Sequence, residues 1–194
     1  MYPARRRRPV TVGRRLAIAT VTGGLLALLN VACGDQRGAP APVESSPARP
    51  ARLAAAAPPA PQPAADGPCR YLSVAAVQAA NGQRVSAVRV SETVPDQPHP
   101  ACFFLTADGA VQLRTWIVVA TPEVARATVD AAAPVAGSDL AELPGGWSGG
   151  SQPTADGAVF AVSRHGTAVV ITTNQRQTIG ARRIAEQVIA SLGL

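Results

Sequence analysis

Hydrophobic residues recur with two different spacings along residues 69–194. Ile184, Val188 and Leu192 are four residues apart, as on one face of a helix. Around residues 111–116, apolar and polar side chains alternate, and residues 167–173 form a run rich in β-branched residues. Both patterns are typical of strands. This part of the chain therefore contains helices as well as strands.

Capping residues locate two helices, and apolar spacing locates a third. Ser73 is expected to cap a short helix that ends at Asn81-Gly82. Thr121, followed by Pro122 and Glu123, is expected to open a second helix that runs to about residue 133. A last amphipathic helix is expected over about residues 177–192.

Strands are expected in the segments between these helices. Tight turns are indicated at Ala107-Asp108-Gly109 and at Arg164-His165-Gly166. Residues 134–156 contain many glycines and are expected to form a long loop. The expected strands are residues 85–91, 101–106, 110–120, 158–163 and 167–173. The order α-β-β-β-α-β-β-α predicts an α+β domain, with an antiparallel sheet of about five strands and helices packed on it.

Residues 1–32 follow the pattern of a signal peptide. Arginines at 5–8 and at 14–15 precede an apolar run at 16–29. This run is shorter than the roughly 20 apolar residues of a transmembrane helix. Asn30-Val31-Ala32-Cys33 resembles the lipobox of bacterial lipoproteins, whose cysteine is joined to a lipid before cleavage. An ordinary signal peptide with an incidental Cys33 is the alternative, and general secretion is preferred to twin-arginine export.

Residues 33–68 are expected to be a lipidated cysteine followed by a disordered tether. The segment is rich in alanine and proline and has no apolar periodicity, so it is not expected to build a core. A Pro-rich recognition segment is the alternative. A single globular domain is then expected over residues 69–194.

Cys69 and Cys102 are expected to form a disulfide. An export signal places them in an oxidising setting, where paired cysteines usually oxidise. A reactive or metal-binding pair is the alternative, but the two residues do not have the close spacing of a zinc motif.

The net charge of +6 comes from the N-terminus. Six arginines precede residue 33, and the other twelve are balanced by the twelve acidic residues. Residues 69–194 contain nine arginines and nine acidic residues, so they are neutral, and their arginines are not interleaved with aromatic residues. A nucleic-acid partner is not expected.

Four short segments behind the lipobox and the tether carry a family resemblance. They are Cys69-Arg70-Tyr71-Leu72, Ala101-Cys102-Phe103-Phe104, residues 146–151 and residues 172–175. Together they resemble an actinobacterial family of secreted lipoproteins of unknown function, and the use of arginine without lysine is typical of such organisms. The resemblance implies a small disulfide-bonded α+β domain at the cell surface and assigns no functional residues.

Gly146-Trp147-Ser148-Gly149-Gly150 matches the G-x-S-x-G pattern of serine hydrolases, and Asp156 and His165 follow in the order of a catalytic triad. From the sequence we expect neither the strand before it nor the helix after it that a nucleophile elbow needs. We expect instead that Trp147, Ser148 and Ser151 contact a ligand or partner from an exposed loop. His99 and His165 have no second ligand at metal spacing, so neither a metal nor a cofactor is expected.

The sequence therefore predicts a lipoprotein on the outer face of the cytoplasmic membrane, held there by the lipid on Cys33. Its domain is expected to be a non-enzymatic module that binds an extracytoplasmic protein or a small ligand. The alternatives are a small surface serine hydrolase that uses Ser148 and a structural or accessory envelope protein.

Overall fold

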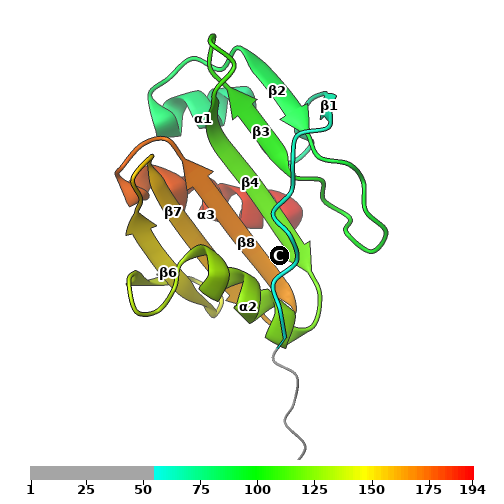
Figure 1. Cartoon of the computed structure of the whole chain (residues 1–194), viewed down its shortest axis with the longest axis vertical. Coiled ribbons are helices and arrows are strands. Elements are labelled where there is room, and N and C mark those ends of the chain that lie inside the picture. Colours follow the sequence, from blue (N-terminus) through cyan, green and yellow to red (C-terminus); the bar gives the residue numbers. More distant parts are fainter. Residues whose placement is uncertain (1–54) are drawn as a thin grey trace, which may run out of the picture. The chain divides into compact units, whose positions relative to one another are not determined.

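The computed structural model describes residues 55–194, so the expected signal peptide and Cys33 lie outside it. Eight strands and three helices occur within these residues (Figure 1). They are β1 (Ala65–Asp66), α1 (Val74–Asn81), β2 (Ala87–Val90), β3 (Cys102–Leu105), β4 (Val111–Val119), α2 (Pro122–Ala132), β5 (Asp139–Leu143), β6 (Trp147–Pro153), β7 (Ala158–Arg164), β8 (Thr167–Thr173) and α3 (Thr178–Leu192).

All eight strands form one antiparallel sheet, in the order β1-β2-β3-β4-β8-β7-β6-β5. β4 and β8 pair over seven residues at its centre, from Leu113 opposite Thr173 to Val119 opposite Thr167. The last strand in sequence therefore lies beside β4, and the pairs β5-β6 and β7-β8 extend the sheet away from it.

The predicted sheet of about five strands in the order α-β-β-β-α-β-β-α is wrong, because β1, β5 and β6 are strands as well. β5 and β6 lie in residues 134–156, where a loop was expected. Glycine is rare in strands, but β6 needs it, since α2 packs very closely on this strand. A Cβ atom at Gly149 would lie 2.8 Å from Val129 Cγ1, and one at Gly150 would lie 3.0 Å from Ala133 Cβ.

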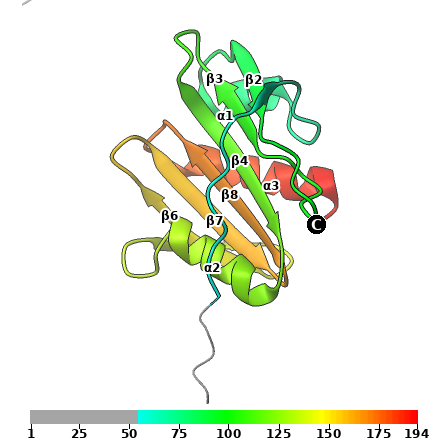
Figure 2. The ribbon, with the colours of Figure 1, turned by 45° about the vertical axis from the view of Figure 1, so that its right-hand side comes forward.

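Helices cover both faces of the sheet. α1 and α3 pack against each other on one face, and α2 lies on the other face over β6, β7 and β8 (Figures 1 and 2). The core on the first face, here called the first core, includes Phe104, Ile117 and Ile184. The core under α2 is smaller and includes Val129 and Val170.

Residues 55–64, here called the strap, run extended along the domain on the same side of the sheet as α2 (Figure 2). The Ala64 N–H donates to the Val90 carbonyl at 2.9 Å, and β1 then pairs with β2 at the edge of the sheet. Residues 55–68, which we expected to be part of a tether, therefore lie on the folded domain.

Candidate binding site

A cavity of about 610 Å³ lies between the strap, the loop of residues 91–101 and β4. We call it the strap cavity. Its lining is mostly apolar and includes Val94 and Trp116, while Glu92, Gln97 and His99 add polar side chains. Trp116 is half-buried and packs at the margin of the core under α2, so the floor of the cavity rests on the sheet.

The 91–101 loop is held at its base and at its tip. At the base, the Ser91 N–H donates to the Ala101 carbonyl at 2.9 Å, and the Ala101 N–H donates to Ser91 Oγ at 3.0 Å. At the tip, Gln97 Nε2 donates to the Val119 carbonyl at 2.8 Å, and the Val119 N–H donates to Gln97 Oε1 at 3.0 Å. The Gln97 carboxamide thus pairs with β4 as a neighbouring strand would, and the wall of the cavity is preformed.

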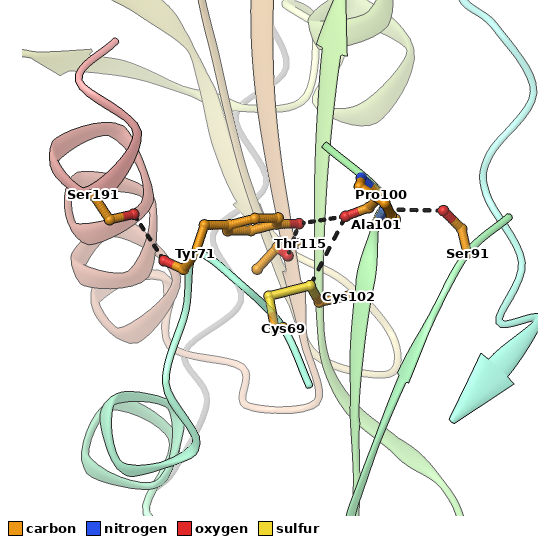
Figure 3. Close-up of a disulfide and its surroundings, with 8 residues drawn as sticks. All are labelled: Cys69, Tyr71, Ser91, Pro100, Ala101, Cys102, Thr115 and Ser191. Atoms are coloured by element: carbon orange, nitrogen blue, oxygen red, sulfur yellow. Dashed lines mark hydrogen bonds between the residues drawn. A yellow bond between two sulfur atoms is a disulfide. The ribbon is translucent and has the colours of Figure 1, made fainter. Parts of the chain in front are cut away.

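Tyr71 supports this wall from the first core (Figure 3). Its hydroxyl donates to the Pro100 carbonyl at 2.8 Å and lies 2.9 Å from Thr115 Oγ1, which donates to it in turn. Burial raises the pKa of Tyr71 to about 12. The ring also meets the ring of His99 edge to face, with 6.1 Å between centroids. Pro100 and His99 are therefore fixed beside the cavity.

A second hollow, of about 480 Å³, lies along the strap around Arg114 of β4. Arg114 Nη2 donates to Thr172 Oγ1 at 3.2 Å, and its buried Nε has no hydrogen-bond partner within residues 55–194. Burial lowers the pKa of this guanidinium. Pro61 and Pro63 of the strap line the same hollow, beside the buried Phe103.

The predicted disulfide is confirmed. Cys69 and Cys102 are bonded, with 5.7 Å between their Cα atoms (Figure 3). The bond ties the segment before α1 to the first residue of β3. It lies next to Tyr71, so it helps to hold the side of the sheet on which the 91–101 loop begins.

The premise that Trp147 lies on an exposed loop is wrong. Trp147 begins β6, is 2% exposed and belongs to the first core, where the Arg164 guanidinium lies 5.0 Å from its ring centroid. Ser148 is exposed and Ser151 half-buried, both on β6. β8 and β7 separate this strand from β4, so these residues are roughly 14 Å from the strap cavity in the sheet plane.

Ser148, Asp156 and His165 do not form a catalytic triad. Asp156 lies in the turn before the seven-residue β7, and His165 lies in the turn after it. The two side chains are therefore roughly 20 Å apart, at opposite ends of this strand. In the described part of the chain, no three His, Cys, Asp or Glu residues are grouped as a metal site would require. His99 lines the strap cavity instead.

Sequence reasoning missed the strap cavity. Its walls come from residues 58–64, 91–101 and 116–118, which only the strand order brings together. Two of these walls, the strap and the 91–101 loop, are rich in proline, which we interpreted as a sign of linkers and loops. No helix in residues 55–194 has the length and apolar character of a membrane span.

A family model described as a domain of unknown function, DUF2020, matches residues 53–194. No curated protein matches the chain. The matched range starts before the strap and runs to the last residue, so it contains every wall of the strap cavity.

Proposed function

The chain belongs to the DUF2020 family, and we propose that it is a cell-surface lipoprotein whose domain binds a small, largely apolar ligand in the strap cavity without catalysis. The observation that carries this proposal is the cavity itself. Its volume of about 610 Å³ falls in the usual range of ligand pockets, and its mostly apolar lining with a few polar groups is typical of them.

The hydrogen bonds around the cavity support a binding role. Both walls are attached to the sheet, the loop through Gln97 and the strap through Ala64. A preformed pocket loses little conformational freedom when it binds, which favours affinity. The hydrolase alternative gains no support from the geometry, because Asp156 and His165 lie at opposite ends of β7.

Ligand binding can be measured with N-phenyl-1-naphthylamine, a neutral apolar fluorophore, added to the full chain. We expect its fluorescence to rise and the Trp116 emission to be quenched by energy transfer. Val94, 54% exposed, lines the cavity, whereas Leu140, 76% exposed, lies on the distant β5. Val94→Asp should weaken binding about tenfold because an apolar contact is lost. Leu140→Asp should leave binding unchanged. The proposal is wrong if the dye does not bind, or if both variants bind it like the wild type.

The lipid anchor is tested separately, since Cys33 lies outside the described residues. After expression in an actinobacterial host and extraction with a phase-separating detergent, the wild-type chain should enter the detergent phase. The Cys33→Ser chain should stay in the aqueous phase, because it lacks the thiol that accepts the lipid. Equal partition of the two chains would remove the anchor from the proposal and leave the binding site untouched.

A further inference from the structure

β4 is longer than the strand that pairs with it on one side. β3 begins only at Cys102, which lies opposite Thr115, whereas β4 continues to Val119. On its other side β4 is paired with β8 as far as Val119. The last residues of β4 therefore have one edge that β3 does not cover, and this edge faces the 91–101 loop.

The backbone groups of Ile117 point to this uncovered edge. Along an antiparallel strand, the N–H and C=O of alternate residues point to opposite neighbours. Val119 directs both groups to Gln97, on the β3 side, and Ala120 directs its N–H to Gly166, on the β8 side. Ile117, two residues before Val119, therefore directs its N–H and C=O to the β3 side as well.

The position opposite Ile117 cannot supply a donor. The pairing of β3 with β4 stops at Cys102; the residue that would lie opposite Ile117 if the register continued is Pro100, and proline has no N–H. The Pro100 carbonyl is already bonded to the Tyr71 hydroxyl. Within residues 55–194, no hydrogen bond joins the Ile117 N–H or C=O to another group.

These two groups lie at the strap cavity. Ile117 is among the residues that line it, but its side chain packs in the first core, on the opposite face of the sheet. Ile117 therefore lines the cavity through its backbone. The residue is only 2% exposed, and buried backbone groups without partners are rare in folded proteins because they cost free energy.

We propose that the ligand of the strap cavity carries a secondary amide with apolar substituents, and that this amide pairs with the backbone of Ile117. The ligand N–H donates to the Ile117 carbonyl, and the ligand carbonyl accepts from the Ile117 N–H. The apolar substituents lie against Trp116 and Val94. This inference rests on the proposed function and names the chemical class of its ligand. A peptide bond and a small acylated amine offer the same amide.

The test compares amides with the matching esters, which keep the carbonyl but lack the N–H. One arm uses N-(2-naphthyl)acetamide against 2-naphthyl acetate. A second arm uses N-acetyl-leucine N-methylamide against methyl 2-acetoxy-4-methylpentanoate, in which ester oxygens replace both amide N–H groups, to separate a small amide from a peptide. In at least one arm, the amide should bind the full chain about tenfold more tightly, because the ester leaves the Ile117 carbonyl without a donor.

Nuclear magnetic resonance locates the bond. The Ile117 amide proton should move downfield when the amide binds, whereas the Val118 amide, which faces β8 in the register with Ala168, should move little. If amide and ester bind equally in both arms, or if the Ile117 signal does not move, the inference is wrong and the proposed function stands. If the dye and all four compounds fail to bind, the proposed function falls and the inference falls with it.

Discussion

Tyr71 forms hydrogen bonds with three parts of the fold: the 91–101 loop, β4 and α3. Its hydroxyl bonds to Pro100 in the 91–101 loop and to Thr115 in β4. Its backbone carbonyl accepts from Ser191 Oγ in α3 at 2.8 Å. The ring is buried beside the disulfide (Figure 3). A charged phenolate at this place would lose its hydration, which is why burial raises the pKa of Tyr71 to about 12.

Stability should therefore fall at high pH. Unfolded tyrosine loses its proton near its ordinary pKa of 10.0, whereas folded Tyr71 keeps it until about 12. Because the unfolded state binds fewer protons between these values, the free energy of unfolding should decrease by about 2–3 kcal/mol as pH rises from 10 to 12. Urea titrations at several pH values measure this change. Tyr71→Phe should be less stable at pH 9 and should lack the decrease; an equal decrease in both proteins would contradict the assignment.

Gly149 shows why a glycine can be required within a strand. A Cβ atom there would lie 2.1 Å from the Ala161 carbonyl oxygen, on the neighbouring strand β7. Gly149→Ala should reduce the free energy of unfolding by about 2–3 kcal/mol, because β6 must move from β7 or α2. Gly137→Ala is the control, since its Cβ would meet only Gln152 Oε1 at an ordinary 3.5 Å. Equal unfolding midpoints for the two variants would show that this site tolerates a side chain.

At the residue scale, the sequence predicted which two cysteines pair, but it did not predict which side chains surround Trp147. Cys69 and Cys102 could be paired because few alternatives exist for two cysteines in an oxidising setting. Trp147 could not be placed, because its glycine and serine neighbours are typical of an exposed loop. Its burial depends on the first core, to which α1, α3 and several strands contribute.

Elements with strong local signals were predicted close to their true limits. α2 has the expected Thr121 cap and Pro122 at its start, and α3 has the expected amphipathic spacing. The turn between β7 and β8 was also found, and His165 adopts a positive φ of 53° there. β5 and β6 lack such signals, since their strand form depends on pairing with β7 and on contact with α2.

The strap shows that a proline-rich segment can form either a solvated tether or an extended part of a folded domain. Proline suits a solvated tether, but its ring is also apolar, and an extended Pro-rich segment can lie on a sheet without needing backbone donors. Pro61 and Pro63 line the hollow beside Phe103, which is 3% exposed although it belongs to neither core cluster. The strap therefore contributes to the burial of Phe103.

Deleting residues 55–63 should uncover Phe103 and Trp116. We expect tryptophan emission to shift to longer wavelength and N-phenyl-1-naphthylamine binding to be lost, because the strap cavity loses one wall. The same deletion in a Trp116→Phe background should show no shift, since Trp147 lies in the first core away from the strap. An unchanged emission spectrum in the deleted chain would mean that the strap does not cover Trp116.

At the scale of the whole molecule, the candidate site depends on chain topology. β4 carries the floor of the strap cavity, and β3 delivers the 91–101 loop to one of its edges. The strap reaches the same place from the beginning of the domain. Sequence patterns describe neighbours along the chain, so they could not show that these three segments meet. The unpaired edge at Ile117 depends on the register between β3 and β4, which the sequence also left open.

The disulfide should hold these segments together. It joins residues 33 apart in sequence, so its removal should lower the free energy of unfolding by about 3–4 kcal/mol through the added freedom of the unfolded chain. Urea denaturation of a Cys69→Ser, Cys102→Ser chain measures this loss. Cys33→Ser is the matched control, because it removes a thiol and leaves the disulfide.

Dye binding extends this test to the site. Cys102 is two residues from Pro100, and Cys69 is two residues from Tyr71, which holds Pro100. The chain without the disulfide should therefore bind N-phenyl-1-naphthylamine more weakly under conditions in which it is still folded, because the wall of the cavity becomes less ordered. If it binds the dye as tightly as the Cys33→Ser chain, the hydrogen bonds of Tyr71 and Gln97 are sufficient to form the strap cavity, and the disulfide serves stability alone.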